Sequence, residues 1–122
     1  MNRPSHFEIP VDNPDRAEKF YADVFGWSFH RWEGAPSYYG LANTGEEGQG
    51  INGALFQRAE NSVTTLTMDV NSIEEAIASV EAHGGKVLQG KTPIPTMGYF
   101  ATCEDTEGNR IGLFTNDPSA SM

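Results

Sequence analysis

The residues best suited to chemistry in this sequence are a histidine and a glutamate near its start. His6 and Glu8 lie two positions apart in the run His6–Val11, whose alternating pattern predicts a β-strand with both side chains on one face. An imidazole titrates near neutral pH, so His6 could bind a ligand or act as a general base; a core histidine with a backbone partner is the alternative. Glu8 could orient His6, bind a cationic group or pair with Arg110, because an unpaired carboxylate facing a cavity is costly. It could equally reach solvent at the rim.

A second group of candidates consists of threonines and aromatic residues in other predicted strands. Thr65 and Thr67 supply hydroxyls that donate and accept hydrogen bonds, although threonine is also a common strand residue. Aromatic side chains could line a pocket for a flat or apolar ligand, but more often they form core or interface; these are Trp27, Trp32, Tyr38, Tyr39, Tyr99 and Phe100. The predicted ligand-binding set is His6, Glu8, Tyr38, Thr65, Thr67, Phe100 and Arg110.

Other chemistries have little support. The only cysteine, Cys103, excludes an intramolecular disulfide and a multi-cysteine zinc site, and we expect it to be a buried structural thiol. The sequence contains no G-x-S-x-G nucleophile motif, no phosphate-binding loop and no dinucleotide fingerprint. His30 and His83 are weaker candidates. His83 falls in the last turn of a predicted helix, where a positive charge interacts favourably with the helix dipole.

Composition limits the partners. Lys and Arg total 8 against 17 Asp and Glu, so the formal net charge is −9. That balance disfavours nucleic acid and anionic membrane surfaces, and it favours neutral or cationic ligands. A hydrophobic content of 38% is enough for a core, whereas no apolar run has the length of a membrane span and no signal-peptide pattern opens the chain. We therefore expect one soluble, cytoplasmic domain over residues 1–122.

Two helices with clear start and stop signals must position these residues. The first has Asp12 or Asn13 as its cap and Pro14 at its first position, and Gly26 ends it. Its apolar stripe is Ala17, Phe20, Tyr21, Val24 and Phe25. The second opens with the S-x-x-E capping box of Ser72 and ends at Gly84-Gly85. Its stripe is Ile73, Ala76, Ile77 and Val80.

The rest of the chain reads as strands joined by turns. Beyond His6–Val11, in which Pro10 suggests an edge or a strand end, the expected strands are Trp27–Trp32, Ser37–Ala42, Ile51–Gln57, Val63–Val70, Lys86–Gln89, Gly98–Cys103 and Arg110–Phe114. Residues 43–50 are glycine-rich and acidic, which predicts an exposed loop. We expect the polar end, Thr115–Met122, to fray.

This order of elements repeats. Adding 59 to positions in the first half pairs Phe7 with Leu66 and Ala17 with Ala76, and it also pairs glycines: Gly26 with Gly85 and Gly53 with Gly112. The repeat predicts two modules, about 1–58 and about 59–118. Modules this small cannot each fill a core, so they must pair within the chain or across a dimer, and a cavity follows from their curled sheets.

Several stretches resemble a known superfamily. These are His6–Tyr21, Val24–Trp27, Glu81–Val87 and Pro93–Phe114, the last with Thr106 where proline is usual. Together they resemble the glyoxalase/bleomycin-resistance/extradiol-dioxygenase superfamily, which has the vicinal oxygen chelate fold. The resemblance implies an α+β fold of paired βαβββ modules forming curled mixed sheets around a cavity, and a homodimer. It does not imply one function, because this fold hosts isomerases, dioxygenases, thiol transferases and binding proteins.

The resemblance also implies where metal ligands would lie in such enzymes. The four positions, early in the first strand and in the last strand of each half, fall here on His6, Thr65, Gly53 and Gly112. A gap in the intervening loops would move the Gly53 position to Asn52 or Ala54, neither of which restores the usual carboxylate. Because a catalytic zinc or iron needs about three protein donors, we expect a degenerate site with no cofactor and with no metal, or at most adventitious metal binding through His6 and Glu8.

Three functions remain open from the sequence. The first is metal-independent binding of an unidentified small molecule in the module cavity. The second is a metal-independent lyase or isomerase that uses His6 and Glu8 as acid and base. The third is a structural or partner-binding role with no ligand.

Overall fold

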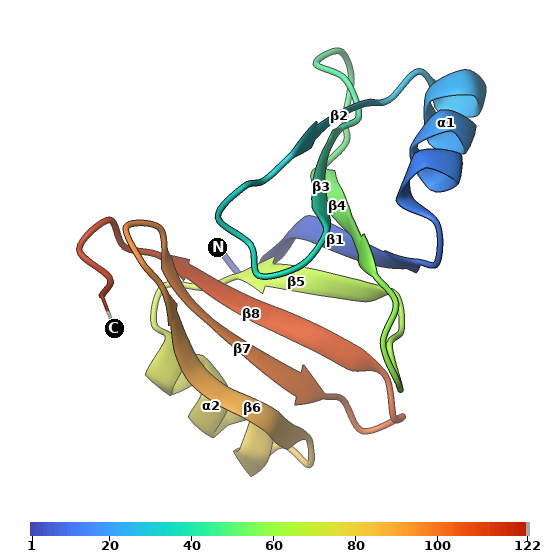
Figure 1. Ribbon diagram of the computed structural model, residues 1–122. Coiled ribbons are helices and arrows are strands. Elements are labelled where there is room, and N and C mark those ends of the chain that lie inside the picture. The colour runs from blue at the N-terminus through green and yellow to red at the C-terminus, as the bar shows by residue number, and fades with distance from the viewer. Residues whose placement is uncertain (122) are drawn as a thin grey trace. The chain divides into compact units, whose positions relative to one another are not determined.

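A computed structural model describes residues 1–121, which form two units. The N-terminal unit is His6–Thr64, and the C-terminal unit combines Met1–Ser5 with the residues from Thr65 onward. In chain order the elements run strand, helix and three strands, and then the same again (Figure 1). Neither helix in the described part of the chain is long and apolar enough to cross a membrane.

The N-terminal unit is a mixed sheet with one helix. Its sheet order is β2-β3-β4-β1, in which β1 runs parallel to β4 and the other neighbours are antiparallel. Pro10 stands next to the last residue of β1, in keeping with a strand end. The elements are β1 Arg3–Val11, α1 Pro14–Phe25, β2 Ser28–Arg31, β3 Tyr39–Asn43 and β4 Asn52–Gln57. Of β1, residues 3–5 are counted with the C-terminal unit.

The C-terminal unit repeats this arrangement. Its sheet order is β5-β8-β7-β6, with β5 parallel to β8 and the remaining pairs antiparallel. The elements are β5 Thr65–Asp69, α2 Ile73–Ala82, β6 Lys86–Ile94, β7 Gly98–Glu104 and β8 Arg110–Asn116. The βαβββ order of both units, with its mixture of parallel and antiparallel strand pairs, confirms the predicted α+β fold.

Both helices begin where their capping residues predict. Of the two candidate caps of α1, Asn13 is the cap, since its side chain accepts a hydrogen bond from the Arg16 N–H. Ser72 caps α2 in the same way. Gly26 ends α1 in the left-handed conformation, with φ of 76°, whereas after α2 the left-handed residue is Gly84. The left-handed glycine after α2 therefore lies one residue before Gly85, which is the position that the offset of 59 pairs with Gly26.

The strand β6 is longer than predicted. The sequence pattern suggested Lys86–Gln89, but pairing with β7 continues to Ile94 through two register shifts. Pro93 lies within the added part, which is tolerated because β6 is the last strand in the sheet order and one of its sides needs no backbone donor. Cross-strand pairing, which local sequence does not show, sets this length.

The predicted fraying of the C-terminal end is wrong for residues 115–121. Strand β8 continues to Asn116, and the Asp117 N–H then donates to the Met97 carbonyl. The Thr96 N–H donates to the carbonyl of Ala120, which is itself buried. Hydrogen bonds to the turn between β6 and β7 thus order this segment. Met122, also part of that prediction, lies outside the described residues.

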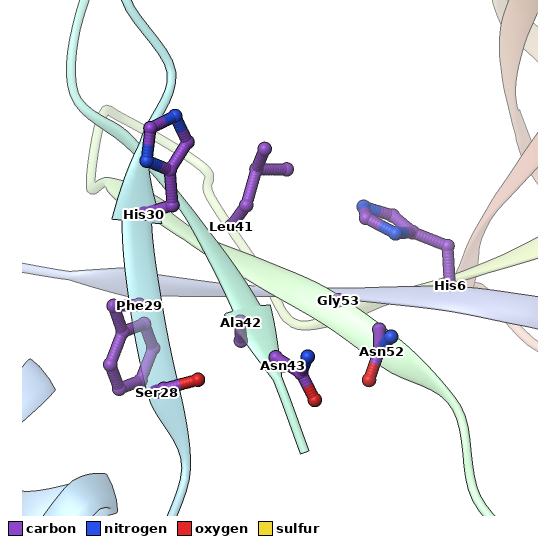
Figure 2. A pocket seen from close by; sticks show the side chains of 9 residues that line it. All are labelled: His6, Ser28, Phe29, His30, Leu41, Ala42, Asn43, Asn52 and Gly53. Carbon is purple, nitrogen blue, oxygen red and sulfur yellow. The ribbon is translucent and has the colours of Figure 1, made fainter. Parts of the chain in front are cut away.

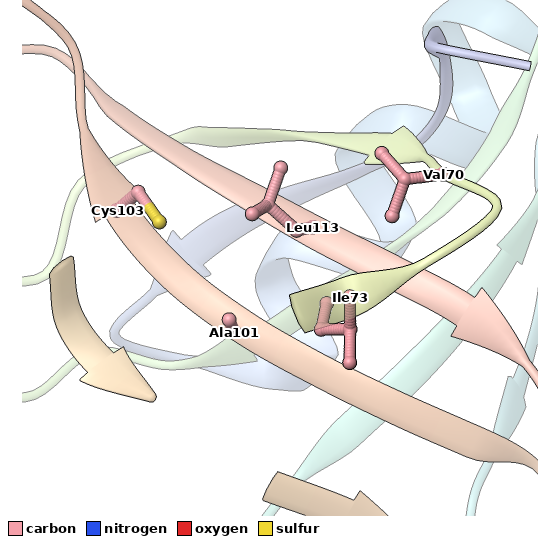
Figure 3. Close-up of a cluster of buried hydrophobic side chains, with 5 residues drawn as sticks. All are labelled: Val70, Ile73, Ala101, Cys103 and Leu113. Atoms are coloured by element: carbon pink, nitrogen blue, oxygen red, sulfur yellow. The ribbon is translucent and has the colours of Figure 1, made fainter. Parts of the chain in front are cut away.

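The C-terminal unit contains a compact apolar cluster between α2 and its sheet (Figure 3). The cluster consists of Val70, Ile73, Ala101, Cys103 and Leu113. Burial raises the pKa of the Cys103 thiol, and the charge of Glu81 adds to this effect. Cys103 is therefore the buried structural thiol that was expected.

Candidate ligand-binding site

One face of the N-terminal sheet brings polar side chains together. Strand register aligns His30 with Leu41, Leu41 with Ala54, and Ala54 with Glu8, so these four share one side of the sheet. By the alternation of each strand, the residues two positions away lie on the same side. One such neighbour is His6, which is paired with Asn52.

An open pocket of about 400 Å³ lies in this unit (Figure 2). Its lining combines amides, hydroxyls and imidazoles with small and apolar groups. The lining residues are His6, Ser28, Phe29, His30, Leu41, Ala42, Asn43, Asn52 and Gly53. Of the predicted ligand-binding residues, His6 is the one that lines this pocket.

His6 belongs to a short hydrogen-bonded network with Tyr39 and Glu8. The Tyr39 hydroxyl lies 2.8 Å from His6 Nε2 and donates to Glu8 Oε2 at 2.5 Å. The direct distance between His6 Nε2 and Glu8 Oε2 is 4.0 Å, so the hydroxyl bridges the two groups. All three side chains are partly buried. The glutamate thus orients His6 through Tyr39 rather than by direct contact.

This network determines which nitrogen of His6 carries the hydrogen. A tyrosine hydroxyl has one hydrogen, and Tyr39 donates it to the Glu8 carboxylate. Towards His6 the hydroxyl oxygen can therefore only accept, so Nε2 is the protonated nitrogen. In the neutral ring, Nδ1 then keeps its lone pair, and it has no hydrogen-bond partner among residues 1–121.

The surroundings favour this protonation state. Burial lowers the pKa of His6 below its ordinary value of 6.5, and the nearby Glu8 charge offsets only part of that effect. Burial and the Glu8 carboxylate both raise the pKa of the Tyr39 hydroxyl. At neutral pH His6 is consequently neutral and Tyr39 keeps its hydrogen. The network offers one basic nitrogen, Nδ1.

Tyr38 does not join this network. Its hydroxyl donates to Glu18 of α1 at 2.6 Å, and its ring lies against Arg31, which also bonds Glu18. The neighbouring Tyr39 takes the position beside His6. Sequence reasoning placed Tyr39 only among the aromatic residues that could line a pocket. Strand alternation allows one of two adjacent tyrosines to face His6, but the start of β3 is needed to decide which one.

The predicted residues Thr67 and Phe100 lie on β5 and β7 of the C-terminal unit. Gly112 is paired with Thr67 on one side and with Thr102 on the other. A Cβ atom at Gly112 would lie 2.6 Å from the Thr67 hydroxyl, so these groups share a face. Phe100 is paired with Phe114 two residues along the same strands. Ligand binding by Thr67 and Phe100 stays a prediction.

The two remaining predicted residues also belong to the C-terminal unit. Thr65 is the buried polar residue at the start of β5. Arg110 opens β8 opposite Glu104, and its Nε is buried without a hydrogen-bond partner in residues 1–121. Arg110 was the proposed partner of Glu8. Within the N-terminal unit the Glu8 carboxylate instead accepts a hydrogen bond from the Tyr39 hydroxyl.

The pairing of Gly53 with Gly112 is wrong by one residue. Gly53 is aligned with Phe7, and a Cβ atom there would lie 2.5 Å from both the ring and the carbonyl oxygen of Phe7. It therefore faces away from His6. Ala54, aligned with Glu8, is the counterpart of Gly112, so the last strands follow an offset of 58. The chain between the first and last strands of the module is one residue longer from Glu8 to Ala54 than from Thr67 to Gly112, which reverses the face.

The donor set does not fit the metal site that the resemblance implies. Within residues 1–121 no group of three or more His, Cys, Asp or Glu side chains is placed to hold a metal ion. Beside His6 and Glu8, strand β4 contributes Asn52 and Ala54. The Asn52 carbonyl oxygen already accepts from the Thr44 N–H, and alanine has no donor atom. A zinc or iron ion would lack the third strong ligand that it needs.

Known proteins share this fold. A hypothetical protein from Bacillus halodurans C-125 superposes with a TM-score of 0.75 at 17% identity, over 98% of both chains. Methylmalonyl-CoA epimerase from Mycobacterium tuberculosis superposes with a TM-score of 0.69 at 15% identity, over 94% of this chain and 88% of that one. At such identities the likeness shows the fold alone.

Sequence comparisons identify the family. A glyoxylase-like domain-containing protein from Didymella fabae is 28% identical over 91% of each chain. The family model of the Glyoxalase/Bleomycin resistance protein/Dioxygenase superfamily matches residues 3–113, which is nearly the whole chain. This match agrees with the paired βαβββ modules, and the chain therefore belongs to that superfamily.

Proposed function

We propose that the pocket of the N-terminal unit binds a small molecule, neutral or cationic, without a metal ion. The observation that carries the proposal is the unpartnered Nδ1 of His6, a neutral base held beside an open pocket by Tyr39 and Glu8. A pocket with a few oriented polar groups among apolar ones is typical of small-molecule sites. The formal charge of −9 supports a ligand that is not an anion.

A thermal-shift screen tests this proposal. The wild-type chain and His6→Ala are screened against a small-molecule library, with and without divalent metal ions. A ligand at about 100 times its Kd stabilises the folded state by about 2.7 kcal/mol, which is a readily measured rise in Tm. We expect hits that do not need metal and that His6→Ala loses.

His83→Ala is the matched control, because His83 is exposed and its ring bonds the Ser79 carbonyl at the end of α2. It should retain every hit. Hits that appear only with a divalent metal, or that His6→Ala keeps, would contradict the proposal.

A second candidate function is a metal-independent lyase or isomerase. The free Nδ1 could remove a proton from a bound substrate, and the resulting imidazolium would be stabilised through Tyr39 by Glu8. His6→Ala should then abolish turnover of a hit compound while the free energy of unfolding changes little. Substrate loss that is equal in wild type and His6→Ala would exclude this role. A destabilisation of several kcal/mol would instead assign His6 to the core.

A further inference from the structure

Two asparagines stand in the same pocket as His6. Asn52 is aligned with His6 across β1 and β4, and Asn43, the last residue of β3, is paired with Ser28 of β2. All four residues line the pocket. In Figure 2 the two asparagine side chains lie between Ser28 and His6.

The loop after β3 determines how both amides are oriented. The Thr44 N–H donates to Asn52 Oδ1 at 2.9 Å, and the Gly45 N–H donates to Asn43 Oδ1 at 2.9 Å. A backbone N–H can only donate, so the side-chain atom that meets it must be the amide oxygen. In Figure 2 the amide nitrogen of each asparagine is drawn above its amide oxygen, so the two amides have the same orientation.

Each asparagine therefore has a satisfied oxygen and an NH₂ group left over. Neither NH₂ group has a hydrogen-bond partner among residues 1–121. Beside them, neutral His6 contributes an acceptor, Nδ1. The pocket thus combines two uncharged donors with one acceptor.

We infer that Asn43 and Asn52 form a pair of amide donors that binds an acceptor oxygen of the ligand, while His6 Nδ1 accepts a hydrogen bond from it. This inference rests on the proposed function and names its ligand class: a neutral molecule with a carbonyl oxygen beside an N–H or O–H, such as a primary amide. A cation without an acceptor oxygen cannot use the donor pair. A carboxylate could use it, but it has no hydrogen for Nδ1 and is repelled by the acidic chain.

Three probes with the same ring separate these possibilities. Benzamide has both the carbonyl and the N–H, benzylamine has no acceptor oxygen, and benzoate has no donor. Each is titrated into the full chain while NMR follows the side-chain NH₂ signals of Asn43 and Asn52 and the ¹⁵N shift of His6 Nδ1. We expect benzamide to move all three, benzoate to bind more weakly, and benzylamine to leave the amide signals in place.

Asn43→Asp and Asn52→Asp are the sharpest variants. Each keeps an oxygen to accept from the loop N–H and replaces the NH₂ donor by a second oxygen. Because one hydrogen bond contributes about 0.5–1.5 kcal/mol, each variant should bind benzamide about 2- to 12-fold more weakly. Asn13→Asp is the control, since it adds the same charge, keeps the cap of α1 and does not line the pocket. It should bind benzamide as the wild type does.

Unchanged benzamide affinity in both pocket variants would overturn the inference. So would a benzylamine titration that moves the two NH₂ signals as far as benzamide does, or three probes that move none of the signals. The proposed function is judged separately, because a metal-independent hit in the thermal-shift screen that His6→Ala loses would still support it.

Discussion

The two units have the same order of strands and helix, yet their helices meet the sheets in different ways. In the C-terminal unit Ile73 of α2 is buried in an apolar cluster with Cys103. In the N-terminal unit α1 has no buried residue, and it faces its sheet with Glu18, which accepts from Tyr38 and Arg31. Three apolar residues of α1 stay exposed, namely Phe20, Val24 and Phe25.

The opposite faces of the sheets differ as well. The N-terminal sheet holds the network of His6, Tyr39 and Glu8, whereas the matching rows of the C-terminal sheet contain Thr67 and Gly112. Topology is thus common to both units, while the hydrogen-bonded network of His6, Tyr39 and Glu8 lies in the N-terminal unit alone. A repeat therefore predicts the backbone path and not the chemistry, because each side chain depends on neighbours that the repeat does not preserve.

The largest expected difference concerns the helices. Ile73→Ala should lower the free energy of unfolding by about 2–5 kcal/mol, since Ile73 is 2% exposed and its loss leaves a cavity. Phe20→Ala on α1 should change it by no more than about 0.5 kcal/mol, because Phe20 is 55% exposed. Urea unfolding of both variants measures the two values. Equal losses would show that the exposed face of α1 is covered in solution.

A smaller difference is expected between two glycines. A Cβ atom at Gly53 would meet the Phe7 carbonyl oxygen, which cannot move without the strand, so Gly53→Ala should cost about 1–3 kcal/mol. At Gly112 the nearest atom is the Thr67 hydroxyl, which can rotate away, and Gly112→Ala should cost less. The same urea experiment ranks them. The reverse order would contradict the register that turns Gly53 away from His6.

The caps should behave alike in both units. Asn13→Ala and Ser72→Ala each remove a side chain that accepts a backbone N–H, and each should cost about 1 kcal/mol. Agreement to within about 0.5 kcal/mol would show that capping is local. A much larger loss of stability in Ser72→Ala would mean that the start of α2 is coupled to the apolar cluster.

The smallest change concerns the titration of His6. Glu8 is the group that raises the His6 pKa against the effect of burial, so Glu8→Gln should lower that pKa further below 6.5. The unfolded chain then binds the proton more tightly than the folded one, and folding stability falls as pH decreases below 6.5. NMR titration of the His6 ring measures the pKa, with Glu47→Gln in the exposed loop as control. A higher pKa in Glu8→Gln would contradict the network.

Local signals predicted much of this molecule. Helix α1 begins and ends where its sequence signals predict, at Asn13, Pro14 and Gly26. The alternation around His6 placed it on the same face as Glu8. The length of β6 escaped prediction because strand pairing extends it through Thr92 and Pro93, where the sequence has no alternating pattern. For the candidate site, the sequence singled out His6 and Glu8 as a pair on one face, but not the tyrosine that joins them.

The helices, the faces of β1 and the family followed from local periodicity and from motifs that stay together in the chain. Strand pairing was needed to show that Tyr39 and not Tyr38 contacts His6, and that Ala54 and not Gly53 shares its face. Side chains alternate along a strand, so a change of one residue in a loop or strand start reverses every orientation after it. Loop lengths and cross-strand pairing therefore set the chemistry of this site.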